Sequence, residues 1–177
     1  MTRIMLDLET LGNNPGCVIV AIGAVKFGDG KILEEFYERV DPQSCVTAGL
    51  RLEVEAVMWW LGQGDDARKE ITKPGMDLRA ALQFFAAWIG QVQPNEIEVW
   101  GNGENFDNVI LEAAYDTLKM PRPWKFSRDR CYRTAVKLFP AAPKIDAFRS
   151  GTHHNALEDA RSQALHLMAI LARLETN

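Results

Sequence analysis

Hydrophobic and polar residues alternate along the first part of the chain, a pattern typical of β-strands. In the first such segment, residues 3–9, Leu6 and Leu8 occupy one set of alternate positions, while Asp7 and Glu9 belong to the other. Because successive side chains of a strand point to opposite faces, the segment predicts a strand with one apolar face and one acidic face.

Two further strands are predicted directly after it, joined by a tight turn. Residues 17–27 are rich in Val and Ile, and residues 31–40 alternate again. The Gly-Asp-Gly sequence at residues 28–30 tolerates the positive φ that hairpin turns need. We therefore expect a three-stranded sheet whose last strand closes before Pro42.

Beyond residue 50 the apolar residues recur mostly at helical spacing. The pattern predicts helices over residues 52–61, 65–72, 77–92, 105–118, 129–139 and 156–174. It also predicts a buried strand at residues 97–100 and a brief edge strand at residues 124–126. Strands followed by alternating helices and strands indicate an α/β fold with a mixed sheet.

Composition is that of an ordinary globular domain. Of the 177 residues, 47% are hydrophobic and 25% are charged. A chain of this length buries about 70% of its unfolded surface, so one core forms without disulfides or structural metals. With no repeat, low-complexity tract or linker, we expect residues 1–177 to form a single domain.

The cysteines favour a reducing compartment. Cys17, Cys45 and Cys131 are odd in number and form no CxxC pair, which argues against a disulfide framework or a structural zinc site. Acidic residues interrupt the N-terminal apolar segment, and no apolar run approaches the length that spans a bilayer. We expect a cytoplasmic protein.

Charge is unevenly distributed. The formal net charge of −4 counts weakly against binding nucleic acid, which requires cations against phosphates. Residues 121–137, however, carry six basic residues against one acid, Asp129, and include Arg128 and Arg133. This segment is a candidate phosphate-binding surface, with an ordinary solvated face as the alternative.

Asp7 and Glu9 are the first candidates for chemistry. Two residues apart on a strand, they project from the same face. Two carboxylates held this close repel each other unless they are solvated or share a divalent cation, and carboxylate oxygens are preferred ligands of Mg²⁺. A solvent-exposed strand face is the alternative interpretation.

The second candidate is Asp107. It follows the strand predicted to end near Trp100, inside the first turn of the next helix, and such strand-to-helix turns often hold ligands. The alternative is that the helix macrodipole favours an acid there. Phe106 beside it is a candidate substrate contact, although a core position is the plainer interpretation.

The third candidate is the segment from His154 to Asp159. Asn155 and Glu158 form a capping-box pattern at the start of the last helix, which explains Glu158 without chemistry. His154 and Asp159 then occupy the two positions that normally form a hydrophobic staple. An imidazole beside a carboxylate suits a base next to a metal ligand; a His–Asp hydrogen bond that ties down the helix start is the alternative.

Taken in order, these segments resemble the three motifs of the DEDDh 3′→5′ exonucleases of the ribonuclease H-like superfamily. The motifs stand here as Asp-Leu-Glu-Thr-Leu-Gly at residues 7–12, Asn-Phe-Asp at residues 105–107, and residues 154–159. A Tyr four residues before the last Asp would mark the sister subclass, but that residue is Asn155. Where many members have an Asn four residues before the second-motif Asp, this chain has Gly103.

Within this family the chain most resembles a group that includes tailed-phage DNA exonucleases and mycobacterial-type exoribonucleases. The likeness extends to Met-Trp-Trp at residues 58–60, with Ala-Arg at residues 67–68, and to residues 129–134. Several family members are homodimers, so the resemblance makes a homodimer a candidate state. It also implies a mixed five-stranded sheet with helices on both faces.

The resemblance implies that two divalent cations, Mg²⁺ or Mn²⁺, are held by four carboxylates, with Asp7 bridging them. The four are Asp7, Glu9, Asp107 and Asp159. In such a site one metal activates water and the other stabilises the leaving oxygen. His154 is then the general base, since an imidazole near its usual pKa of about 6.5 accepts a proton close to neutral pH.

The implied substrate is the 3′ end of single-stranded nucleic acid, DNA slightly favoured over RNA. Terminal nucleotide contacts are expected from Thr10, Leu11 and Gly12, and backbone contacts from Arg128 and Arg133. Adjacent helical residues point in different directions, so only one of Trp59 and Trp60 is expected to stack on a base. Trp60 is the candidate; the alternative is that both are core or interface residues.

Two interpretations compete with a nuclease. One is a non-catalytic nucleic-acid-binding module on the same fold, in which we would expect one of the acids or the His to be lost. The other is a structural domain with coincidental acids, which needs three independent coincidences in the right order. None of the five residues is missing, so the sequence favours the enzyme.

Overall fold

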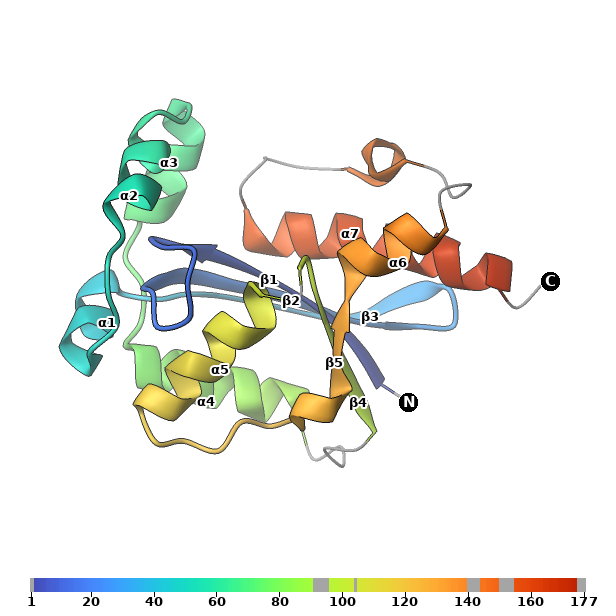
Figure 1. Cartoon of the computed structure of the whole chain (residues 1–177), viewed down its shortest axis with the longest axis horizontal. Helices are drawn as coiled ribbons and strands as arrows, with labels where there is room; N and C mark the ends of the chain where they lie inside the picture. Colours follow the sequence, from blue (N-terminus) through green and yellow to red (C-terminus); the bar gives the residue numbers. More distant parts are fainter. Residues whose placement is uncertain (1, 91–95, 104, 140–143, 150–154, 175–177) are drawn as a thin grey trace.

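A computed structural model describes residues 2–90, 96–103, 105–139, 144–149 and 155–174. It contains a five-stranded mixed sheet in the order β3-β2-β1-β4-β5 (Figure 1). The strands are β1 (Thr2–Thr10), β2 (Ile19–Gly28), β3 (Lys31–Arg39), β4 (Ile97–Gly101) and β5 (Asp129–Cys131). β2 is antiparallel to both of its neighbours, whereas β1, β4 and β5 are parallel. The α/β class and the mixed sheet are confirmed.

Helices cover both faces of this sheet (Figure 1). α4 and α5 lie on one face and α7 with α6 on the other, while α2 and α3 stand at the end where β1 finishes. The helices are α1 (Pro42–Ala48), α2 (Val54–Leu61), α3 (Asp65–Thr72), α4 (Leu78–Ile89), α5 (Asp107–Thr117), α6 (Tyr132–Leu138) and α7 (Ala156–Leu174). Two short 3₁₀ turns are η1 (Phe126–Arg128) and η2 (Ile145–Phe148).

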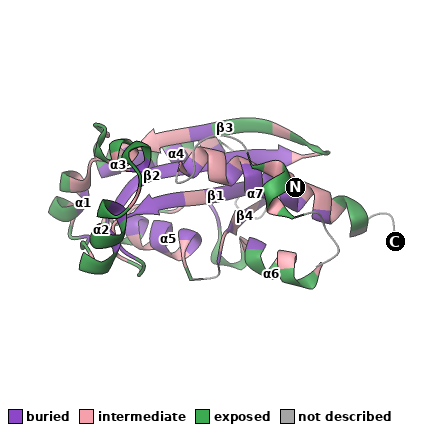
Figure 2. Cartoon of the chain, turned by 90° about the horizontal axis from the view of Figure 1, so that it is seen from above, coloured by how far each residue is buried: buried purple, intermediate pink, exposed green. Residues whose placement is uncertain are grey.

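Each face of the sheet has its own hydrophobic core. Ile4, Leu6 and Leu8 of β1 pack with the buried sides of α4 and α5. Met5, on the opposite face, packs with the small and aliphatic residues of α7, including Ala160. Figure 2 shows the consequence, a largely buried β1 and β2 against largely exposed α1, α2 and α3.

One sequence prediction was wrong at the edge of the sheet. The predicted strand at residues 124–126 does not form, because Trp124 is buried against Phe85 and Tyr115, and Phe126 begins the 3₁₀ turn η1. The edge strand is β5, so helix α6 begins at Tyr132 and not at Asp129. Asp129 is fixed in the strand, where its Oδ1 accepts hydrogen bonds from Trp124 Nε1 at 2.7 Å and Asn108 Nδ2 at 2.9 Å.

A short helix was also not predicted. α1 begins directly after β3, with Asp41 as its N-cap and Pro42 in its first turn, a combination that favours a helix start. The turn at residues 28–30 is confirmed, since Asp29 and Gly30 have φ of 49° and 72°.

The other predicted elements are confirmed, with small shifts at their ends. In the part of the chain that the structure describes, no helix is long and apolar enough to cross a membrane. The three cysteines are free thiols.

Candidate active site

Three of the predicted acids meet where β1 ends against the start of α7. Asp7 and Glu9 project from the same face of β1, and Asp159 comes from the first turn of α7. Carboxylate oxygens of the three residues lie within 4.8 Å of one another. Hard oxygen donors at this spacing fit a divalent cation such as Mg²⁺ or Mn²⁺.

A glycine on the neighbouring strand allows this meeting. Gly23 of β2 is paired with Asp7 in the sheet. A Cβ at Gly23 would lie 2.2 Å from the carbonyl carbon of Ala156 and 2.3 Å from the amide nitrogen of Leu157. The first turn of α7 therefore rests directly on the backbone of β2, which brings Asp159 beside β1.

The Asn155 half of the predicted capping box is confirmed at the start of α7. Asn155 Oδ1 accepts hydrogen bonds from the backbone N–H groups of Leu157 and Glu158, both at 3.2 Å. The Glu158 carboxylate accepts two hydrogen bonds from Arg161 Nη1 at 2.7 Å. Glu158 thus belongs to the helix start, and Asp159 is the acid of this turn that joins the cluster.

Gln163 is a site residue that the sequence did not indicate. It lies one helical turn after Asp159, is 4% exposed, and donates a hydrogen bond from Nε2 to Asp7 Oδ1 at 2.8 Å. The available signal was a polar residue four positions after Asp159, in a helix whose neighbouring buried positions are Ala160 and Ala164. This bond fixes the orientation of the Asp7 carboxylate.

Asp107 is buried at the N-terminus of α5 and holds two backbone segments. Its Oδ1 accepts from the N–H of Leu8, between Asp7 and Glu9, at 3.1 Å, and its Oδ2 accepts from the N–H of Asn102 at 2.7 Å. It lies outside the group of three carboxylates, but each of its oxygens retains a second lone pair. Asp107 therefore positions β1 and can still contribute to a metal site.

The electrostatics of the cluster favour a bound cation. Burial raises the pKa of Glu9 to about 8, and repulsion from Asp159 and Asp107 adds to the effect. Burial, followed by repulsion from Asp107 and Glu9, raises the pKa of Asp7 well above its usual value. Burial also raises the pKa of Asp107 to about 6, although its backbone hydrogen bonds oppose the shift. A divalent cation would supply the missing positive charge.

The predicted base, His154, lies outside the described residues. So does His153, its neighbour in the sequence.

A hollow of about 410 Å³ opens beside Glu9, and we call it the acidic hollow. Its walls come from the end of β1, from α2 and from the start of α5, and include Glu9, Thr10, Asn13, Glu55, Trp59 and Phe106. Leu11 and Gly12 are not among its lining residues. Gly12 is buried, where a Cβ would lie 2.4 Å from the Cβ of Cys17.

The two tryptophans have different positions. Trp60 lines the acidic hollow but is only 3% exposed, and its Nε1 donates to the Thr10 carbonyl at 2.8 Å. Trp59 is 48% exposed and packs edge-to-face on Trp60. Trp60 therefore supports the end of β1, and Trp59 offers the larger ring surface to the hollow.

The basic segment forms a second hollow of about 450 Å³, the basic hollow. It shares Asn13 and Phe106 with the acidic hollow and is also lined by Arg133, Thr134 and Lys137. The Arg133 guanidinium donates from Nη2 to the carbonyl of Asn102 at 2.8 Å. Phe106 therefore borders both the hollow beside Glu9 and the hollow that these cations line.

Other cations of this segment are placed differently. Arg122 pairs with Glu112 at 2.7 Å, and Arg130 pairs with Glu98 at 3.1 Å. Arg128 belongs to η1 before β5 and lines neither the acidic nor the basic hollow.

Comparison with solved structures places this fold among exonucleases. The nuclease domain of 3′hExo, a DEDDh family member bound to rAMP, is 13% identical, with a TM-score of 0.65 over 97% of this chain and 92% of that one. Exonuclease X in complex with 5′-overhanging duplex DNA is 17% identical, with a TM-score of 0.57 over the same shares of the two chains. E. coli exonuclease I with a dT13 oligonucleotide is 16% identical, with a TM-score of 0.67 over 99% of this chain and 42% of that one.

Comparison with protein families covers almost the whole chain. No curated protein matches it. The model of the Rv2179c-like 3′-5′ exoribonuclease domain matches residues 2–171, a span that contains all four acids of the site. The chain therefore belongs to the Rv2179c-like 3′-5′ exoribonuclease domain family and is a 3′-5′ exonuclease of ribonuclease H-like fold.

Proposed function

We propose that this enzyme removes nucleotides from the 3′ ends of single-stranded nucleic acid by hydrolysis that depends on two divalent cations, Mg²⁺ or Mn²⁺. The observation that carries the proposal is the group of three carboxylates within 4.8 Å, at the junction of β1 and α7. When bound, the cations activate water and stabilise the charge on the leaving oxygen. The family description names RNA, so we propose RNA over the DNA that the sequence slightly favoured.

The chain's own residues divide the remaining work. Asp7, Glu9 and Asp159 would hold the cations, and Asp107 would join them while it keeps β1 in place. We assign the general base to His154 on the resemblance to the DEDDh enzymes. Thr10 and Trp59 border the hollow beside Glu9, where the terminal nucleotide would lie.

We also propose that residues 1–177 act as one exonuclease domain in the cytoplasm. Three free cysteines support a reducing compartment. We propose a homodimer on the family resemblance alone.

The test is degradation of 5′-labelled single-stranded RNA and DNA of matched sequence with Mg²⁺, Mn²⁺ or EDTA. We expect a ladder that shortens from the 3′ end, faster on RNA, and absent with EDTA or in Asp159→Asn. Asp66→Asn is the matched control, because Asp66 is an exposed acid on α3. Intact RNA and DNA under every metal would refute the proposal, and faster loss of DNA would reverse the assignment of the sugar.

The role of His154 has a separate test. His154→Ala should lose about 10² to 10⁴ in rate but keep its affinity for Mn²⁺, since a base is not a ligand. Asp159→Asn should lose both. Equal loss of Mn²⁺ affinity in calorimetric titrations of the two variants would contradict this division of roles.

A further inference from the structure

A third hollow lies on the far side of α6 from the basic hollow. This distal hollow of about 430 Å³ is enclosed by α6, η2 and α7. Its charged lining residues are Arg133, Lys144, Arg149 and Asp146. Because Asp146 pairs with Arg149 at 3.4 Å, the three cations leave the hollow with an excess of positive charge.

Two buried rings, those of Tyr132 and His166, line the distal hollow. The Tyr132 hydroxyl and His166 Nδ1 are 2.6 Å apart, and both side chains are buried. The ring of Phe148 stacks on His166 with a centroid distance of 5.5 Å. Phe139 adds a further aromatic ring to the wall. Cations beside aromatic surfaces are the combination that proteins use to hold single-stranded nucleic acid.

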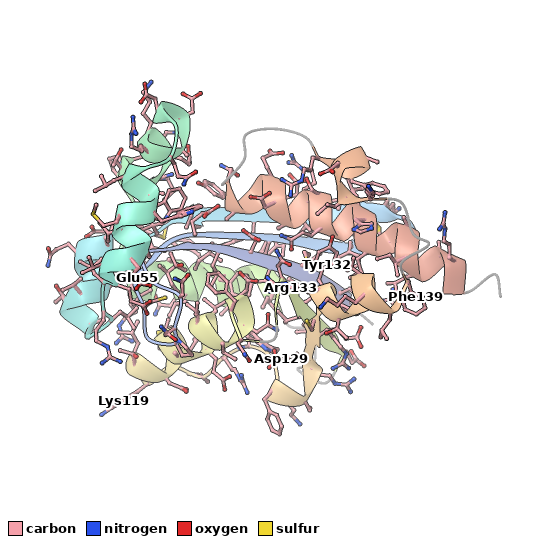
Figure 3. The ribbon with its side chains drawn as sticks, turned by 45° about the horizontal axis from the view of Figure 1, so that its top comes forward. Glu55, Lys119, Asp129, Tyr132, Arg133 and Phe139 are labelled. Carbon is pink, nitrogen blue, oxygen red and sulfur yellow. The ribbon has the colours of Figure 1, made fainter. Side chains whose placement is uncertain are left out.

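The distal hollow continues the candidate active site. Phe106 and Asn13 line both the acidic and the basic hollow, and Arg133 lines both the basic and the distal hollow. In Figure 3 Tyr132, Arg133 and Phe139 lie along α6, and Glu55, a wall of the acidic hollow, lies across the molecule on α2. The three hollows therefore form one series that starts beside Glu9 and becomes basic.

We propose that the distal hollow binds the single strand upstream of the nucleotide being removed, with Lys144 and Arg149 against its phosphates and Phe139 against a base. This rests on the proposed function, because the strand must enter with its 3′ end at Asp7 and Glu9. A dinucleotide reaches only the acidic and basic hollows. A longer strand also fills the distal hollow, so the enzyme binds it more tightly.

The experiment compares a 5′-labelled dinucleotide with a heptanucleotide of RNA. In Lys144→Ala/Arg149→Ala, kcat/KM on the heptanucleotide should fall about tenfold because KM rises. On the dinucleotide, kcat/KM should stay unchanged. The slope of log affinity against log salt should decrease by about 1.4 on the heptanucleotide, for two lost phosphate contacts. Phe139→Leu should weaken binding of the heptanucleotide but not of the dinucleotide, because stacking is lost without a change in charge.

The control variant is Lys31→Ala/Lys119→Asn, which removes two exposed cations elsewhere. Asn suits position 119, where φ is 52°. Lys119 lies far from α6 in Figure 3. This variant should match the wild type on both oligonucleotides.

Anisotropy of the labelled heptanucleotide in EDTA separates the two proposals. If Lys144→Ala/Arg149→Ala, the distal variant, binds the heptanucleotide more weakly than the control variant, the distal hollow is supported, even if no RNA is degraded. Absence of degradation would refute only the proposed function. The proposal for the distal hollow is refuted if the distal variant degrades or binds both oligonucleotides equally less well than the control. It is also refuted if the distal variant matches the control on both.

Discussion

At the scale of single residues, the carboxylate cluster depends on side chains that are not among the proposed metal ligands. Gln163 makes the one hydrogen bond described for the Asp7 carboxylate, and this bond lowers the pKa of Asp7 against the effect of burial. We expect Gln163 to be a positioning residue, because it would act on the proposed cations only through Asp7.

Replacing Gln163 by Leu tests this role. The variant keeps a side chain of similar size but loses the donor, so the pKa of Asp7 should rise further. We expect about tenfold lower activity near neutral pH, an acidic limb of the pH profile shifted to higher pH, and unchanged KM for RNA. Ser162→Ala is the control, because the Ser162 hydroxyl bonds the Glu158 carbonyl and not the cluster. An unshifted pH profile would show that Gln163 only packs.

Asp107 and Asp159 should respond differently to replacement by Asn. Both carboxylate oxygens of Asp107 accept backbone N–H groups, and an amide offers only one acceptor. We expect Asp107→Asn to lose about 1–3 kcal/mol of stability in EDTA. Asp159→Asn removes repulsion from Glu9 and should be as stable as the wild type or more so. Urea denaturation of the metal-free proteins decides; equal destabilisation would contradict the distinction.

At the scale of elements, the contact between β2 and α7 decides whether the acids meet. A side chain at Gly23 would collide with the backbone of α7, which has no flexible group to move aside. Gly23→Ala should therefore cost about 1–3 kcal/mol, and its activity should fall more than its stability because Asp159 is displaced.

The same strand provides the control. A Cβ at Gly28 meets nothing closer than Leu33 Cδ1 at 3.9 Å, so Gly28→Ala should fold and degrade RNA normally. Thermal denaturation and the RNA assay compare the two variants. Activity of Gly23→Ala equal to that of Gly28→Ala would refute this account of α7.

Element prediction from sequence succeeded where the helical pattern is clear, missed the short helix α1, and failed at the sheet edge because tertiary contacts decide there. Residues 156–174 and 65–72 carry clear helical patterns and form helices over those residues. Residues 124–131 contain one buried ring and one acid bound to it, and no local pattern shows that Trp124 turns into the core beside Phe85.

At the scale of the whole molecule, three of the predicted acids meet in the structure, but the sequence could not show what joins them. Asp7 and Glu9 follow from strand geometry alone, and Asp159 follows from its place after a capping residue. Gly23 matters because of a helix more than 130 residues later in the chain, and Gln163 matters because of β1. Neither dependence leaves a local pattern. Trp60, predicted to stack on substrate, supports Thr10 instead, because its direction depends on how α2 packs.

The raised pKa values make the stability of the whole enzyme depend on pH and metal together. Glu9 titrates near 4.5 when unfolded and at about 8 when folded, so between these values the folded state binds more protons. Without metal, this contribution to stability is complete below pH 4.5 and is lost as the pH rises through about 8. Under the proposed function, Mg²⁺ would take the place of the lost protons as the counter-charge. The difference in melting temperature between Mg²⁺ and EDTA should therefore be larger at pH 8.5 than at pH 5.5. A widening of about 2–4 °C corresponds to about 1 kcal/mol for a chain of this size. In Asp159→Asn, the Mg²⁺–EDTA difference in melting temperature should change less between the two pH values. If the wild type shows the same difference at both pH values, the cluster stays ionised without a cation and this account is wrong.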